Sequence, residues 1–154
     1  MEGVTPANQV VATLQATILK NDSYAAWAAT KFSSAELANP AVSGADANPD
    51  GDGQRNWMEY AYGLEPKTAD ATQLDAEILA GHLTISYRRN ALASQAMITP
   101  EISSDLISWQ SGPTNLVEIA SEPLGGGVER VTVQDVENAV AGPRFVRLRL
   151  GFAP

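Results

Sequence analysis

The sequence contains no cysteine among its 154 residues and a single histidine, His82. Without cysteine the chain has no disulfides, thiolate-ligated zinc sites, iron–sulfur clusters or thiol nucleophiles. This absence does not fix the compartment, because many exported bacterial domains also lack cysteine. No serine or cysteine motif lies near His82, so we expect an edge or surface residue instead of a catalytic base. These absences favour a protein that is not an enzyme and has no catalytic residues.

The sequence also lacks long apolar runs and an excess of positive charge. No run approaches the roughly 20 residues of a membrane span, so we expect no membrane insertion. The start, Met1-Glu2-Gly3, has neither the basic nor the apolar region of a signal peptide, so any export signal was removed or lies outside this chain. A net charge of −8 argues against nucleic acid and anionic membrane surfaces and suits a hard cation.

The first part of the chain predicts helices. Residues 6–20 follow Thr5-Pro6, a helix-start signal, but the stretch VVATLQATIL also alternates like a strand, and both readings stay open. A helix is expected over Tyr24–Phe32, followed by an irregular stretch over 37–49. Another short helix is expected over Arg55–Tyr62, with Gly63 just beyond its end.

After about residue 73 the pattern changes to short strands separated by turn residues. Strands are expected at 76–80, 82–88, 96–103, 106–110, 115–121, 128–134 and 144–151. Gly125-Gly126-Gly127 reads as a hairpin tip, because no Lys-Ser/Thr of a phosphate loop follows it. We therefore predict an α+β protein, with a helical region at 1–70 packed on an antiparallel β-sandwich at 71–154.

One segment, Asn48 to Glu59, matches the twelve-residue calcium loop of EF-hands. Gly53 falls at position 6, where the chain must turn sharply, and Gln54 at position 7 would offer its backbone carbonyl. Side-chain oxygens occupy positions 1, 3, 5, 9 and 12, which are Asn48, Asp50, Asp52, Asn56 and Glu59. Glu59 would bind with both oxygens from the following helix. We predict a Ca²⁺ site with these six ligands.

The context of this loop differs from that of a signalling EF-hand. It occurs once, and irregular sequence separates it from the preceding helix, so there is no helix pair to open. Asp46 lies nearby as a further negative charge. Trp57 and Tyr60 are expected to pack against Trp27 and Phe32, so that calcium would pin two helices together. The sequence thus predicts a structural calcium ion.

The stretches YAAWAATKF, NPDGDGQRNWMEYAYGLEP, LTISYRRN and ITPEISSDLISWQS together resemble a C-terminal module of secreted verrucomicrobial and planctomycete-type bacterial proteins. The loop is also similar to those of dockerins and thrombospondin type 3 repeats. The resemblance covers roughly residues 24–154 and implies an accessory, extracellular or cell-surface region without catalytic residues. Asn48 stands where that pattern has Asp, which should weaken calcium binding.

Three non-enzymatic functions remain open. The first is a calcium-binding structural or anchoring module of an exported bacterial protein, with a protein partner. The second is a self-assembling filament or surface-layer subunit, in which residues 9–19 add as a strand to a neighbour's sheet edge. The third is a carbohydrate-binding module, with Tyr87 and Trp109 as a sugar-stacking platform; core packing is the alternative role of these rings.

Overall fold

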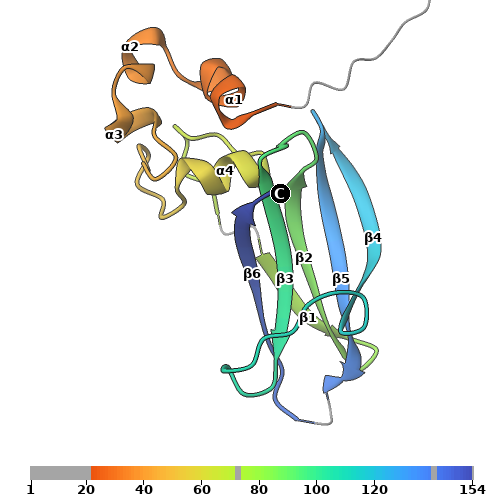
Figure 1. Cartoon of the computed structure of the whole chain (residues 1–154). Helices are drawn as coiled ribbons and strands as arrows, with labels where there is room; N and C mark the ends of the chain where they lie inside the picture. Colours follow the sequence, from red (N-terminus) through yellow and green to blue (C-terminus); the bar gives the residue numbers. More distant parts are fainter. Residues whose placement is uncertain (1–21, 72–73, 140–141, 154) are drawn as a thin grey trace, which may run out of the picture.

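The computed structural model describes residues 22–71, 74–139 and 142–153. A small helical region comes first in the chain and packs against two antiparallel β-sheets (Figure 1). The fold is therefore α+β, as the sequence predicts. The expected element at 6–20 lies outside the described residues. Among the helices of the described part, none is long and apolar enough to cross a membrane.

From residue 22 to the acidic loop, the structure has three helices: α1 (Tyr24–Lys31), α2 (Ser34–Leu37) and α3 (Pro40–Ser43). The predicted helix at Tyr24–Phe32 is confirmed, with the Ser23 hydroxyl accepting a hydrogen bond from the Ala26 amide. The expected irregular stretch at 37–49 is partly wrong, because α3 lies within it. The Asn39 side chain caps that turn and Pro40 is its first residue, a combination that favours a helix start.

The fourth helix, α4 (Asn56–Tyr62), follows the acidic loop and ends where predicted. Gly63 adopts a left-handed conformation (φ 70°) as its C-cap. A Cβ atom added at Gly63 would lie 2.3 Å from Cγ2 of Val128, so glycine also allows α4 to approach the sheet closely.

Six strands form the two sheets: β1 (Leu74–Leu79), β2 (His82–Asn90), β3 (Ala96–Ser103), β4 (Leu116–Gly125), β5 (Val128–Asn138) and β6 (Phe145–Phe152). The larger sheet has the order β1-β2-β5-β4, and β3 pairs with β6 in the smaller sheet. All pairings are antiparallel. The predicted hairpins at Ala80-Gly81 and Gly125–Gly127 are confirmed.

The predicted strand at 106–110 is wrong. Oδ1 of Asp105 accepts hydrogen bonds from the amides of Ile107 (2.8 Å) and Ser108 (2.7 Å), which folds the chain into a turn. Leu106 takes a left-handed conformation (φ 63°), and only Gln110 forms an isolated bridge to Ile102. Hydrogen bonds between the Asp105 side chain and the neighbouring backbone amides therefore replace the expected strand pairing.

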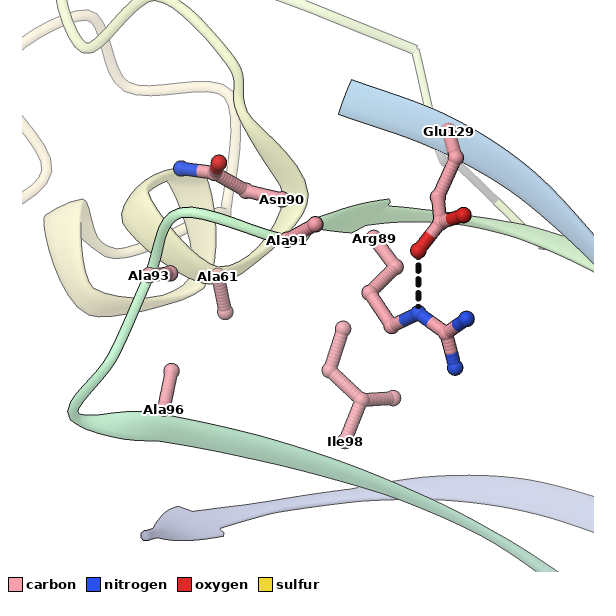
Figure 2. A pocket seen from close by; sticks show the side chains of 8 residues that line it. All are labelled: Ala61, Arg89, Asn90, Ala91, Ala93, Ala96, Ile98 and Glu129. Carbon is pink, nitrogen blue, oxygen red and sulfur yellow. Dashed lines mark hydrogen bonds and ion pairs between the residues drawn. The ribbon is translucent and has the colours of Figure 1, made fainter. Parts of the chain in front are cut away.

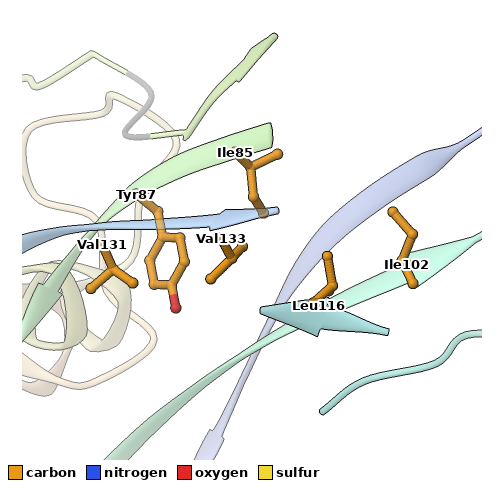
Figure 3. Packing of buried hydrophobic residues seen from close by; sticks show 6 residues of the cluster. All are labelled: Ile85, Tyr87, Ile102, Leu116, Val131 and Val133. Atoms are coloured by element: carbon orange, nitrogen blue, oxygen red, sulfur yellow. The ribbon is translucent and has the colours of Figure 1, made fainter. Parts of the chain in front are cut away.

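The main core lies between the sheets (Figure 3). Ile85, Tyr87, Val131 and Val133 project from β2 and β5. Buried residues of β3 and β4, Ile102 and Leu116, complete the cluster. The alternation of apolar and polar residues along each strand places these side chains on one face.

A second, largely aromatic core joins the helices. Tyr60 of α4 is fully buried, and its ring centroid lies 5.7 Å from that of Trp27 in α1. Trp27 also meets Phe32 at 6.3 Å, while Trp57 lies 4.7 Å from Phe152 of β6. The predicted packing of α4 against the first helix is therefore confirmed, and Trp57 additionally ties α4 to the smaller sheet.

Candidate metal centre

The acidic loop is folded tightly by its own side chains. The Asn48 carboxamide oxygen accepts a hydrogen bond from the Gly51 amide at 2.9 Å, and Asp52 accepts one from the Gln54 amide at 2.7 Å. Gly53 has φ 94°, a left-handed conformation that suits glycine. The Asn56 amide donates to the Ala47 carbonyl at 2.8 Å, which closes the loop onto the start of α4.

This folding brings three carboxylates together. Oxygen atoms of Asp50, Asp52 and Glu59 all lie within 4.8 Å of one another, a spacing able to hold a metal ion. The two aspartates come from the loop, whereas Glu59 reaches the cluster from the first turn of α4. Glu59 is fully buried, although ionised carboxylates are rarely buried without a partner.

Several oxygens of this cluster have no hydrogen-bond partner within the described residues. They are Oδ2 of Asp50, Oδ1 of Asn56 and both carboxylate oxygens of Glu59, and all are buried. The Asn56 amide nitrogen donates to the carbonyls of Val42 (2.8 Å) and Gly44 (2.9 Å), which fixes the orientation of its carboxamide. Leaving a buried polar group unpaired costs about 1–3 kcal/mol, and more for a charge. A set of unpaired oxygens in one place is what a bound cation would satisfy.

The electrostatics of the cluster favour the same conclusion. Burial raises the pKa of Glu59 to about 7, and the negative charges of Asp50 and Asp52 contribute to the increase. Without a cation, the carboxylates repel one another at short range. A divalent ion would convert this repulsion into attraction.

The six predicted ligands are not all in equivalent positions. Asp50, Asp52 and Glu59 form the carboxylate cluster, and Asn56, one turn before Glu59 on α4, carries a further buried oxygen without a partner in the described residues. Asn48 and Gln54 lie within the loop, where their side-chain hydrogen bonds to Gly51 and Asp52 stabilise the turn. Their roles as ligands, through a side-chain oxygen and a backbone carbonyl, remain predictions.

Two neighbouring acids behave differently from what the sequence suggests. Asp46 pairs with Arg55 at 2.9 Å and is exposed, so it does not add its charge to the cluster. Asp70 was missed by sequence reasoning. Its amide donates to Oδ2 of Asp52 at 3.0 Å, and its charge contributes to the raised pKa of Glu59. Asp70 lies outside the twelve-residue pattern, so only the tertiary fold reveals it.

The other residues singled out from the sequence have structural partners. His82 begins β2, and its Nδ1 lies 2.9 Å from the Asp135 carbonyl oxygen. Tyr87 is buried in the core. The guanidinium of Arg147 covers the ring of Trp109, 4.0 Å from its centroid. Tyr87 and Trp109 therefore do not form a shared exposed platform.

A separate small hollow lies between α4, β2 and β3 (Figure 2). Its volume is about 330 Å³, and alanines form much of its lining. Nε of Arg89 donates to Glu129 at 2.7 Å, so the two charged residues that line the hollow are paired with each other. We interpret this pair as part of the scaffold.

Comparisons of the chain with protein-family models, curated proteins and solved structures find no match.

Proposed function

We propose that the segment Asn48 to Glu59 binds a calcium ion that stabilises the fold. The observation that carries this proposal is the set of buried, unpaired oxygens on Asp50, Asn56 and Glu59. Calcium takes six to eight oxygen ligands in a flexible shell. Side-chain and backbone oxygens of a twelve-residue loop supply such a shell.

Calcium suits these ligands better than other common ions. All predicted ligands are oxygens, whereas zinc and copper sites use histidine or cysteine in most proteins. Magnesium requires a smaller octahedral shell and retains several waters. A buried bidentate Glu59 fits the larger calcium ion.

The role that we propose is structural. The ion would bind the loop and α4 together, and α4 packs on α1 through Tyr60 and Trp27 and on β6 through Trp57 and Phe152. Calcium would thereby hold α4 in the position that joins the helical region to the smaller sheet. This is the role of a staple and not of a sensor, since one loop offers no helix pair to open.

We further propose that the chain is an accessory module of an exported bacterial protein, without catalytic activity. The resemblance of its loop and of SSDLISW to modules of secreted proteins supports this proposal. Extracellular calcium is abundant enough to fill a weak site. The module would act as an anchor or spacer that contacts another protein.

Thermal unfolding tests the metal proposal. Chelator-treated protein should melt at a higher temperature when calcium is added, because an ion that binds only the folded state adds about 2.7 kcal/mol at a hundredfold excess over Kd. Magnesium at the same concentration should have a smaller effect. Glu59→Ala should remove the calcium response, and His82→Ala should keep it. A calcium response that survives Glu59→Ala would show that the ion binds elsewhere.

A further inference from the structure

The smaller sheet leaves one long edge of β6 without a partner strand in the described part of the chain. β6 pairs with β3 along one side only. The opposite edge of the sheet, on β3, is bridged at Ile102 by Gln110. Among the described residues, no strand pairs with the outer backbone groups of β6, which makes this edge a candidate for strand addition.

A groove runs along this free edge, and we call it the β6 groove. One hollow of about 410 Å³ is lined by residues of the acidic loop, α4, β1 and β6, among them Met58, Leu74 and Val146. A second hollow of about 460 Å³ is lined by Trp57, Met58 and Phe152. Met58 belongs to both, so the two hollows follow β6 from its first half to its end.

The groove lies where the sandwich is incomplete. The core-facing residues of β6, Val146, Leu148 and Leu150, are only half-buried. On β1, Ala76 and Ile78 pair with Ile85 and Leu83 and share their core face, yet both are exposed. The two strands of the smaller sheet do not cover all four strands of the larger sheet. A third strand beside β6 would extend this cover toward β1.

We propose that the β6 groove accepts an extended strand, residues 9–19 of a second copy of this chain. A strand that adds to the edge of a sheet forms backbone hydrogen bonds with that edge, and the fit of its alternate side chains makes the binding specific. The sequence of residues 9–19 suits both demands. It has no charged residue, and one face of its strand pattern consists of Val10, Ala12, Leu14, Ala16 and Ile18.

The length of the segment also matches. Eleven extended residues span about 36 Å, and β6 has 8 residues, or about 27 Å. The strand would lay its apolar face against Leu148 and Leu74 and its backbone against β6.

The position of Asp22 favours a second copy over the same chain. Only Lys20 and Asn21 join Leu19 to Asp22, a reach of about 11 Å. The Tyr60 hydroxyl donates to the Asp22 carbonyl on one face of α4, whereas Met58 lines the groove on another face. Half the circumference of a helix about 10 Å thick is roughly 16 Å, which is longer than this reach, so a strand ending at Leu19 of the same chain would fall short of the Met58 side of α4.

The other free edges are less suitable. β4 has register shifts at two places and contains Pro123, features that blunt an edge. β1 has only 6 residues. β6 has neither a bulge in its register nor a proline.

The donated strand, residues 9–19, and the accepting β6 groove are different parts of the chain. The contact is therefore heterologous, and assembly would propagate head to tail. Asp52 and Gly53 form part of the groove wall. Calcium binding to the loop would therefore order this wall and promote assembly. The calcium site itself does not depend on assembly, so the two proposals fail independently.

Mixing two variants tests the proposal. A chain without residues 1–20 keeps the groove but has no donor, and Phe152→Lys, at an exposed residue outside the calcium loop, keeps the donor but places a charge in the groove. With calcium present, each should sediment as a monomer, whereas their mixture should form a heterodimer that grows no further. Melting curves and calcium binding report whether each variant is folded. A mixture of two folded variants that stays monomeric overturns the proposal, as does a wild-type chain that stays monomeric at high concentration.

Matched substitutions refine the test in the full-length chain. Leu14→Lys, on the apolar face of the donor, should abolish assembly, and Gln15→Lys, on the other face, should preserve it. On the acceptor, Met97→Lys lies on the exposed outer face of β3 and should assemble normally, in contrast to Phe152→Lys. A free peptide of residues 9–19 should cap growing assemblies. If Gln15→Lys blocks assembly as strongly as Leu14→Lys, or Met97→Lys as strongly as the substitution in the groove, the proposed contact is wrong. It is also wrong if the peptide has no effect on assembly.

Discussion

Asn56 and Glu59 lie one turn apart on α4, and both are fully buried with side-chain oxygens that have no partner in the described part of the chain. Residues spaced in this way share one face of a helix. On this face, Glu59 shares a carboxylate cluster with Asp50 and Asp52. An arrangement so costly without a ligand is best explained by a cation that belongs to the folded state.

The charge of Glu59 should have opposite effects with and without calcium. Glu59→Gln keeps the shape but removes a buried charge that neighbouring aspartates repel. In chelator the variant should therefore melt above the wild type, and in millimolar calcium below it. Calorimetry in both conditions measures the order, with the exposed Glu77→Gln as a control that shifts in neither. The same order of melting temperatures in both conditions would contradict a charge-driven calcium site.

Gly63 should be required for the contact between α4 and the sheet. Gly63→Ala combines a left-handed conformation with an approach of 2.3 Å to Val128. The conformation alone costs about 1–2 kcal/mol, and overpacking adds about 1–3 kcal/mol. At Gly112 the φ is 85° and the space beyond is open, so Gly112→Ala isolates the conformational part. Denaturant unfolding should show a clearly larger loss for Gly63→Ala; equal losses would mean that the close approach is unimportant.

The turn at Asp105 should make the protein sensitive to acid. Hydrogen bonds from the Ser108 and Ile107 amides lower the pKa of Asp105 to about 2. An unfolded aspartate titrates near 3.9, so the carboxylate stabilises the fold above that pH, and this contribution disappears as the pH falls toward 2. Carboxyl chemical shifts measure the pKa directly. Asp105→Asn should lose this part of the acid dependence, and an ordinary pKa at Asp105 would disprove the turn.

The local part of the site was predictable from the sequence because it depends on spacing. A glycine at position 6 and oxygens at alternate positions identify the loop, and Glu59 at position 12 lies in the first turn of the next helix. The end of α4 was predictable for a similar reason, since Gly63 marks a left-handed cap. Such features depend on a few neighbouring residues.

The remaining features depend on contacts between distant residues. The backbone amide of Asp70 donates to the side chain of Asp52, 18 residues earlier, and no local pattern indicates this. Asp46 forms an ion pair with Arg55 and does not take part in the carboxylate cluster. The stretch 106–110 has strand-like residues, but the Asp105 side chain accepts a hydrogen bond from the Ile107 amide, and the stretch forms a turn. β1 is only partly covered because the smaller sheet does not extend over it. The residue pattern of a single strand does not specify how two sheets assemble.

Titration of the chelator-treated protein with calcium, followed by isothermal calorimetry, tests the central claim most directly. A loop with Asn48 in place of aspartate and without a second loop should bind one ion with a Kd of roughly 10⁻⁵ to 10⁻³ M, in the range of extracellular modules. Glu59→Ala should abolish the binding heat, and His82→Ala should retain it. Absence of heat at millimolar calcium, or a nanomolar Kd, would contradict the account of a weak, structural calcium site.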